Sequence, residues 1–246
     1  MDIKGCVALV TGANRGIGRA FVDGLLAAGA AKIYAGMREP QAQHDPRVQA
    51  IRLDVTDQGQ VAEAAATCGD VTLLINNAGV LTASPLIGAA SMDGARTEME
   101  VNYFGALAMC RAFAPLLGRN GGGAIVNILS VASFTTGGKF GSYSASKMAA
   151  LGLTRGVRIE LRAQGTLVVG VHPGFVDTDM VANVTAAKIS PAQVVERTLA
   201  AIAAGEEEVL PDERSVGIRQ TLREDPYALE RSAQAAWDAL TIAGKP

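Results

Sequence analysis

The sequence predicts an α/β fold: a single doubly wound parallel β-sheet, flanked by helices on both faces. Three observations support this prediction. Short apolar runs alternate with longer amphipathic patterns from residue 5 to about residue 210, which is typical of parallel strands joined by right-handed crossover helices. The apolar runs are continuous, which indicates strands that are buried on both faces. Polar and glycine-rich segments follow the ends of these runs, where sheets of this kind bind ligands.

The composition is that of a globular protein, with 49% hydrophobic and 19% charged residues. No linker or low-complexity tract interrupts the pattern, so we expect one domain over residues 1–246. A net charge of −2 argues against a nucleic-acid or anionic-membrane surface. No window approaches the ~18 apolar residues of a membrane span. Cys6, Cys68 and Cys110 form no CxxC pair, and with two histidines they predict reduced thiols, no metal site and a cytoplasmic location.

The first unit predicts a phosphate-binding turn. Residues 6–10 are a buried strand, and the segment that follows places glycines at Gly12, Gly16 and Gly18, immediately before a helical pattern. Glycines let the backbone approach an anion, while the free N–H groups and dipole at the helix start favour negative charge. A merely tight turn between strand and helix is the alternative interpretation.

The second strand, residues 32–36, indicates which coenzyme the turn would serve. Arg38 follows its end, where dinucleotide-binding folds contact the adenosine ribose, and Arg15 lies within the glycine turn. Arginines suit a ribose 2′-phosphate, whereas an acidic residue suits a free hydroxyl. We therefore expect NADP(H). Glu39 could reach a hydroxyl, so NAD(H) stays possible.

Two further strands deliver polar groups to the same edge. Residues 50–55 form the third predicted strand and carry Asp54, whose carboxylate could accept from an adenine amino group. Residues 71–75 form the fourth, and small and amide side chains follow at 76–79, which suit close approach of a flat cofactor. A simple turn is the alternative for that segment.

A predicted helix over residues 91–117 contains Asn102, and a strand over residues 124–129 ends at Ser130. Tyr143 and Lys147 follow, four residues apart on one face of a helix that reaches about residue 163. An ammonium beside a phenol lowers the phenol's pKa from about 10 and makes it a usable proton donor and acceptor. Two exposed polar residues are the alternative.

The rest of the chain completes the sheet. We expect a strand over residues 167–171, a helix from Ser190 onwards, a short strand near residues 207–210 and a terminal amphipathic helix over residues 225–241. We expect His44 to be exposed and His172 to have a packing role. Polar or small residues fall at the carboxyl end of each main strand, and this convergence predicts one site: Gly12, Arg38, Asp54, Asn76, Ser130 and Pro173.

On these motifs the chain resembles the classical short-chain dehydrogenases/reductases, from Val7 to about Thr178. The resemblance implies a Rossmann-like fold, hydride transfer between nicotinamide and a carbonyl or carbinol carbon, and a catalytic tetrad of Asn102, Ser130, Tyr143 and Lys147. Tyr143 would be the acid or base, and Ser130 would hold the substrate oxygen. Lys147 would lower the pKa of Tyr143 and bind the ribose, and the Asn102 backbone would hold a water molecule.

The resemblance and the motifs together assign the coenzyme-binding residues. They lie in the glycine turn, after the second, third and fourth strands, on the tyrosine helix and in the segment after residue 172: Gly12, Asn14, Arg15, Gly16, Ile17, Gly18, Arg38, Asp54, Val55, Asn77, Ala78, Gly79, Tyr143, Lys147, Pro173, Gly174, Val176 and Thr178.

Beyond Thr178 the resemblance weakens. A lid over about residues 175–190 is short, and the segment over about residues 205–246 lacks the family's glycine-rich ending. A homo-oligomer, dimer or tetramer, is expected from the family. An apolar pocket and the lack of an evident anion clamp favour a neutral, fairly hydrophobic substrate; the expected lining is Phe134, Phe140, Phe175, Met180, Val181 and Val184.

The leading hypothesis is therefore an NADPH-dependent carbonyl reductase, or an alcohol dehydrogenase in reverse, that acts on a ketone, aldehyde or secondary alcohol. An NAD-linked alcohol or steroid-type dehydrogenase is the second enzyme hypothesis. A non-catalytic NADP-binding sensor or scaffold is the third, and it would predict erosion at Ser130, Tyr143 or Lys147, all of which are present.

Overall fold

The computed structural model describes residues 1–242, with the side chains of residues 1–239. Seven parallel strands form one sheet in the order β3-β2-β1-β4-β5-β6-β7. The predicted Rossmann-like fold class is confirmed. The strands are β1 (Val7–Thr11), β2 (Lys32–Met37), β3 (Val48–Arg52), β4 (Leu73–Asn76), β5 (Ala124–Ile128), β6 (Leu167–Val171) and β7 (Glu208–Val209).

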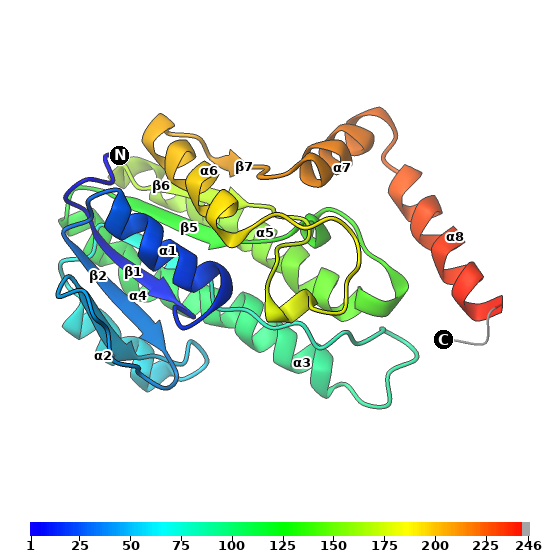
Figure 1. The fold of residues 1–246 in the computed structure, drawn as a ribbon, viewed down its shortest axis with the longest axis horizontal. Helices are drawn as coiled ribbons and strands as arrows, with labels where there is room; N and C mark the ends of the chain where they lie inside the picture. The colour runs from blue at the N-terminus through cyan, green and yellow to red at the C-terminus, as the bar shows by residue number, and fades with distance from the viewer. Residues whose placement is uncertain (243–246) are drawn as a thin grey trace.

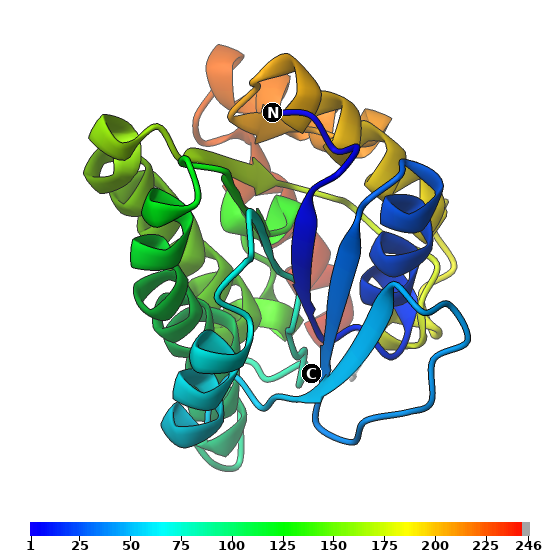
Figure 2. The same ribbon diagram turned by 90° about the vertical axis from the view of Figure 1, so that its left-hand side faces the viewer.

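Helices cover both faces of the sheet (Figures 1 and 2). On one face lie α1 (Gly16–Ala27) and α6 (Pro191–Ala204), which pack side by side. On the other face lie α2 (Gln58–Thr67), α4 (Ala106–Arg119) and α5 (Gly141–Leu161). Each crossover helix returns the chain to the amino end of the next strand, so every strand ends at the same edge.

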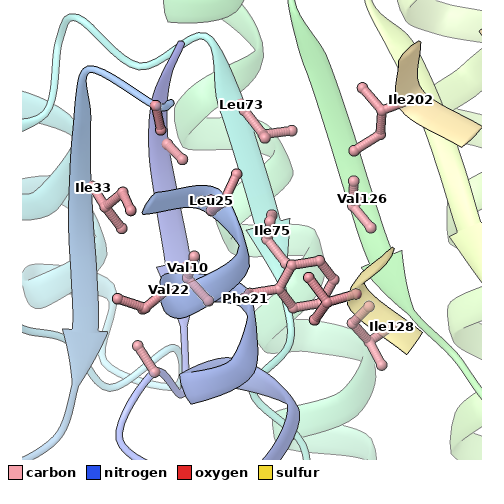
Figure 3. Packing of buried hydrophobic residues seen from close by; sticks show 14 of the residues in the cluster. Val10, Phe21, Val22, Leu25, Ile33, Leu73, Ile75, Val126, Ile128 and Ile202 are labelled. Carbon is pink, nitrogen blue, oxygen red and sulfur yellow. The ribbon is translucent and has the colours of Figure 1, made fainter. Parts of the chain in front are cut away.

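The core consists of one apolar layer on each face. Alternate residues of β1 divide between them. Val10 faces the layer with Phe21 and Leu25 of α1 (Figure 3), and Leu9 faces the layer with Phe113 of α4. All five side chains are completely buried. Burying one such side chain contributes roughly 1.5–3 kcal/mol, which explains why the strands read as continuous apolar runs rather than as alternating ones.

The strand order fixes the place of a ligand site. The chain runs from β1 outward to β3 and then crosses back, so that β4 pairs with the other side of β1. The connections after β1 and β4 therefore leave the carboxyl edge on opposite faces. Ligands in such sheets bind in the crevice that opens between these connections.

Several boundaries differ from the sequence-based expectation. The third strand begins at Val48 and ends at Arg52 rather than spanning residues 50–55, because its pairing with β2 starts at Ile33 opposite Val48. Leu53 still bonds to the end of β2, but Asp54 turns away and its N–H donates to the Gln60 side chain (2.9 Å).

The helix expected over residues 91–117 is divided. It begins as α3 (Asp93–Met99), continues as a π-helical turn over Glu100–Gly105, and becomes α4. Asn102 lies in this π-helical turn. Such turns widen the backbone spacing and are frequent at functional sites.

A helix of the carboxyl-terminal region was not predicted. It is α7 (Glu213–Glu224), and the terminal helix expected over residues 225–241 is α8 (Ala228–Ile242). Asp225, Pro226 and Tyr227 separate the two. In Figure 1, α8 extends away from the sheet beyond α7. The Leu240 side chain, expected on its apolar face, lies outside the described residues.

Within residues 1–242, no helix has the length and apolar character that crossing a bilayer requires. The same part of the chain holds no group of three or more histidine, cysteine or acidic side chains placed to bind a metal ion. All three cysteines are buried free thiols. His44 is exposed, as expected.

Candidate active site

A cleft of about 1640 Å³ runs along the carboxyl edge of the sheet. Residues that follow β1, β2, β4, β5 and β6 line it, together with α5 and the lid. The predicted catalytic and coenzyme-binding residues line the cleft except Gly18 and Asn102, which are buried behind its wall. Asn76, expected at the same edge, does not line it, because its amide is buried and donates to Asn127 Oδ1 (2.9 Å). The convergence expected from the strand ends is therefore present in three dimensions.

The glycine turn is built from close backbone contacts. A Cβ on Gly18 would lie 2.1 Å from the carbonyl oxygen of Gly12, so no side chain fits there. Gly16 has a φ of +55°, and a Cβ on it would lie 3.2 Å from the Thr178 methyl group. These contacts explain why glycines are needed at positions 16 and 18. They also show that Thr178, distant in the sequence, lies against the turn.

The start of α1 is open to an anion. Its N-cap residue is Arg15, which makes no side-chain capping bond, so the first N–H groups of the helix have no side-chain acceptor. Gly16 and Ile17 line the cleft at this point. An uncapped helix start beside a glycine cradle fits the pyrophosphate of a dinucleotide.

Thr11 was not among the predicted site residues, yet it holds the fourth-strand segment in place. Its hydroxyl accepts from the N–H groups of Asn77 and Ala78, each at 3.0 Å. The Asn77 amide donates back to the Thr11 carbonyl (2.9 Å). The two strand ends of the crevice are thus fixed to each other. In the sequence, this role was indicated only by the position of Thr11 directly before the first glycine of the turn.

The expected ribose end contains Arg38, Glu39 and Asp54. Arg38 is exposed, and in the described part of the chain no carboxylate pairs with it. Arg15 differs, because it forms an ion pair with Asp179 of the lid at 2.8 Å. Both partners are largely exposed, so this pair contributes little stability.

Tyr143 and Lys147 occupy one face of α5, as predicted. Lys147 is 5% exposed, and its ammonium donates to the carbonyl oxygen of Ile128 (2.9 Å). It lies 5.8 Å from the centre of the Tyr143 ring. Burial lowers the pKa of Lys147 to about 8.

The expected lowering of the Tyr143 pKa is wrong for this structure. Burial raises that pKa to about 12, the hydrogen bond with Ser130 partly opposes the rise, and the charge of Glu98 adds to it. Desolvation of the phenolate therefore sets the direction of the shift, and the Lys147 ammonium is engaged by a backbone carbonyl. At neutral pH Tyr143 is a protonated phenol.

Ser130 lies at the end of β5, where its hydroxyl accepts from the Ala132 N–H (3.1 Å). The Val131 N–H donates to the Pro173 carbonyl (3.0 Å), which joins this turn to the segment after β6. Ser133 bonds to the Ser130 carbonyl and lies 2.9 Å from His172 Nδ1. The serine is therefore supported from two strands.

His172 has the packing role that was expected. It is 1% exposed and stacks on Phe134, with ring centres 4.2 Å apart. Burial lowers its pKa to about 3, so it is neutral over the physiological range. Phe134 was expected to line the substrate pocket, but it packs instead between His172 and the guanidinium of Arg219. The other five predicted apolar residues do line the cleft.

Asn102 is 3% exposed and clamps the segment after β4. Its amide donates to the Val80 carbonyl (3.0 Å) and to Ser146 Oγ (2.9 Å), and its oxygen accepts from the Val80 N–H (2.9 Å). A Cβ on Gly79 would lie 3.1 Å from that oxygen. The observed contacts of the side chain hold the cleft wall against α5.

Glu98 is a site residue that sequence reasoning missed. Its side chain is completely buried; Oε1 accepts from the N–H (2.7 Å) and hydroxyl (2.8 Å) of Thr82, while Oε2 has no partner. Thr82 lines the cleft, and the next residue, Ala83, is the one non-glycine residue of the described chain with a positive φ (+54°). A carboxylate four residues before Asn102, on the same helix face, was the available signal.

Comparisons with known proteins agree with this geometry. A family model described as short chain dehydrogenase matches residues 6–189. The 1-deoxy-11-beta-hydroxypentalenate dehydrogenase of Streptomyces exfoliatus is 34% identical over 202 residues, which cover 76% of this chain and 73% of the relative. The 3-oxoacyl-[acyl-carrier-protein] reductase FabG of Escherichia coli (strain K12) is 30% identical over 227 residues, which cover 84% of this chain and 93% of FabG.

The chain is also similar to solved structures. A short chain dehydrogenase from Burkholderia cenocepacia J2315, in complex with NADP, superposes with a TM-score of 0.92 at 45% sequence identity. The match covers 95% of this chain and 99% of that one. The likeness therefore includes most of the carboxyl-terminal region, which lies beyond the family model.

Proposed function

Because the chain belongs to the short-chain dehydrogenase family, we propose that it is an NADPH-dependent carbonyl reductase, which also acts in reverse as an alcohol dehydrogenase. The proposed substrate is a fairly hydrophobic ketone, aldehyde or secondary alcohol. The observation that supports this best is the pairing of a phosphate cradle at the start of α1 with the hydroxyls of Tyr143 and Ser130 in one cleft.

In this proposal the bound coenzyme supplies the hydride, and the chain's own residues manage the proton. Tyr143, a phenol with its pKa raised to about 12, donates its proton to the oxygen that becomes an alkoxide. Ser130 bonds to the same oxygen and holds it beside Tyr143. Lys147, with its pKa lowered to about 8, is a buried cation behind the phenol, and it would bind the ribose hydroxyls as in the family.

Arg38 supports NADPH over NADH. It is an exposed guanidinium at the end of β2, on the cleft, where a ribose 2′-phosphate would accept charge-assisted hydrogen bonds. The NADP bound to the Burkholderia protein is consistent with this preference. Arg15 shares its charge with Asp179, so we assign the larger part of the preference to Arg38.

Replacing the proposed acid tests the reaction. Tyr143→Phe should lower kcat for ketone reduction by at least ~10²-fold, the scale of a lost general acid, and leave the Kd for NADPH nearly unchanged. Tyr227→Phe is the matched control, because Tyr227 is 67% exposed and lies outside the cleft. Full turnover by Tyr143→Phe would defeat the assignment.

A second candidate is an NAD-linked alcohol or steroid-type dehydrogenase. Glu39 favours it, because its carboxylate lines the cleft next to Arg38 and could accept from ribose hydroxyls. Titration of the protein with NADH and with NADPH separates the two candidates.

A non-catalytic NADP-binding sensor or scaffold is less favoured, since Ser130, Tyr143 and Lys147 are all retained. Homo-oligomer assembly, the single domain and the cytoplasmic location stay predictions from the sequence.

A further inference from the structure

The start of α7 is fixed to the backbone that lines the cleft. Asp212 is 8% exposed, and its Oδ2 accepts from the Gly174 N–H at 2.7 Å. Its Oδ1 accepts from the Ser215 N–H (2.7 Å), and Ser215 bonds back to the Asp212 N–H to complete a capping box. The first turn of α7 therefore has a set position relative to Gly174.

Arg214, in that first turn, is held against the cleft by packing. A Cβ on Gly174 would lie 2.9 Å from Arg214 Cδ, so the arginine stem occupies the space that a side chain at residue 174 would need. The guanidinium carbon lies 4.7 Å from the centre of the Phe175 ring. Arg214, Gly174 and Phe175 all line the cleft. Stacking on a ring orients a guanidinium and leaves its edge N–H groups free to bind a ligand.

The charge of Arg214 is not neutralised by a carboxylate among the described residues. In the part of the chain with described side chains, no carboxylate lies within ion-pair distance of it. Arg219, on the same helix, shows the contrast: it also stacks on a phenyl ring, that of Phe134 (4.8 Å), but it pairs with Glu208 at 3.1 Å and does not line the cleft. One arginine is used inside the fold, and the other is presented to the cleft.

Two other cations of the cleft lack this support. Arg96 and Lys139 line it, but no hydrogen bond, ion pair or ring contact fixes either side chain among the described residues. Arg214 is also linked to the turn that carries Ser130 by a series of contacts. Gly174 follows Pro173, whose carbonyl accepts from Val131, the residue after Ser130. Arg15 and Arg38 instead belong to the glycine turn and the end of β2.

We infer that Arg214 is a substrate-binding residue that selects a carbonyl or carbinol substrate carrying a carboxylate. A planar guanidinium binds a carboxylate with two parallel hydrogen bonds, and one cation matches a single negative charge. Phe175, Met180 and Ile218 would then cover the apolar part of the same molecule. This inference rests on the proposed function, and it replaces the neutral substrate expected from the sequence.

The test compares oxo acids with their own methyl esters, because the reacting carbonyl is the same and only the charge differs. Aryl oxo acids of increasing chain length, beginning with benzoylformate, are assayed with NADPH. For at least one chain length the wild type should prefer the acid by ~10-fold or more in kcat/KM, the scale of a charge-assisted bidentate contact.

Arg214→Met keeps the length of the stem and removes the charge. This variant should lower kcat/KM for the preferred acid by ~10–100-fold, mainly by raising KM. It should leave kcat/KM for the methyl ester within ~2-fold of the wild-type value. Arg214→Lys, which keeps the charge but not the planar fork, should be intermediate. Arg223→Met, on the exposed side of α7, is the matched control and should change kcat/KM for neither the acid nor the ester.

A binding readout accompanies the rates. The chain has a single tryptophan, Trp237, which packs on Gly138 between two cleft-lining residues. Quenching of its fluorescence by the oxo acid, with NADP⁺ present, should give a Kd that rises by ~10-fold or more in Arg214→Met and stays constant in Arg223→Met. Circular dichroism and NADPH affinity verify that each variant folds.

Three results would overturn the inference. In the first, the wild type shows no preference for any acid over its methyl ester. In the second, Arg214→Met lowers kcat/KM for the acid and for the ester by the same factor. In the third, Arg214→Met raises the KM for NADPH instead, which would place the guanidinium on a coenzyme phosphate. In each case Tyr143-dependent reduction of the esters would leave the proposed function standing. If no carbonyl compound is reduced with either coenzyme, the proposed function fails as well.

Discussion

The two ends of the cleft are built in different ways. At the coenzyme end, Gly12, Gly16 and Gly18 lie within seven residues of one another, and a Cβ on Gly18 would meet the carbonyl oxygen of Gly12 in the same turn. At the substrate end, Asp212 reaches Gly174 across 38 residues, and Trp237 packs on Gly138 from the far end of the chain. The glycine turn is thus a short-range structure, which Asn77 and Thr178 contact from elsewhere in the chain, whereas the substrate end is assembled from distant segments.

This difference explains how each end can vary. A phosphate cradle tolerates few side chains, since an added methyl group meets the backbone of the turn itself. At the substrate end, the lid and α7 line the cleft, and α8 packs on Gly138 through Trp237. Substitutions in these elements can alter what binds without disturbing the cradle.

The largest expected effect breaks the coenzyme end alone. Gly18→Ala would place a Cβ 2.1 Å from the Gly12 carbonyl oxygen, so the turn must open. We expect NADPH affinity to fall by ~10²-fold or more, as for loss of several charge-assisted bonds, with the protein still folded. Isothermal calorimetry measures the affinity. Gly152→Ala, where no atom crowds the added methyl, is the control. Wild-type affinity in Gly18→Ala would show that the turn does not bind the coenzyme.

A smaller effect concerns coenzyme choice. Arg38→Asp removes the guanidinium proposed to bind the 2′-phosphate and adds a carboxylate that repels it. KM for NADPH should rise by ~10–100-fold while KM for NADH falls. Arg19→Asp serves as the control, since Arg19 is exposed and lies outside the cleft. An unchanged ratio of the two constants would contradict the proposed ribose pocket.

The third effect lies at the junction of the two ends. Glu98→Gln keeps an oxygen for the N–H and hydroxyl of Thr82 but removes the charge that raises the Tyr143 pKa. The Tyr143 ionisation should therefore move to lower pH. Tyrosinate absorbance, taken as the difference from Tyr143→Phe, measures it. Thr82→Val, which keeps the charge, should leave the ionisation in place. Equal titration of Glu98→Gln and wild type would show that the carboxylate acts on the loop alone.

The smallest effect appears only in acid. The pKa of His172 is lowered to about 3 in the folded state. As the pH falls below about 6.5, the unfolded chain therefore binds a proton at this histidine, whereas the folded chain does not. Stability is therefore complete above about pH 6.5 and falls as the pH drops towards 3, by at most ~1.4 kcal/mol per pH unit. His172→Gln should flatten this dependence in urea unfolding at pH 7 and pH 4.5. His44→Gln, at the exposed histidine, should not. If His172→Gln and the wild type lose the same free energy of unfolding between pH 7 and pH 4.5, burial of a neutral His172 is not the cause of the pH dependence.

The same contrast describes what the sequence could predict. The strands, the glycine turn and the face shared by Tyr143 and Lys147 follow from short-range patterns, and they were predicted within a few residues. The π-helical turn at Asn102 was not, because its cause is tertiary: Asn102 bonds to Val80 and Ser146. Helix α7 was missed because its apolar stripe is thin, although its capping box joins Asp212 and Ser215, which lie only three residues apart in the sequence.

Electrostatics could be predicted only in part. A phenol and an ammonium at a spacing of four residues indicated a lowered pKa for Tyr143, and that spacing is present. Burial of the phenol reverses the direction, and burial is not encoded in the spacing. Likewise, nothing local marks Phe134 as a partner of His172 rather than of the substrate.

A crystal structure grown with NADP is the most direct test of the central claim, that the cradle and Tyr143 serve one coenzyme. The account predicts the pyrophosphate at the start of α1, the adenosine ribose beside Arg38, and the nicotinamide ring in contact with the Tyr143 hydroxyl. A dinucleotide whose ring lies away from Tyr143, or a cleft that takes up none, would contradict it.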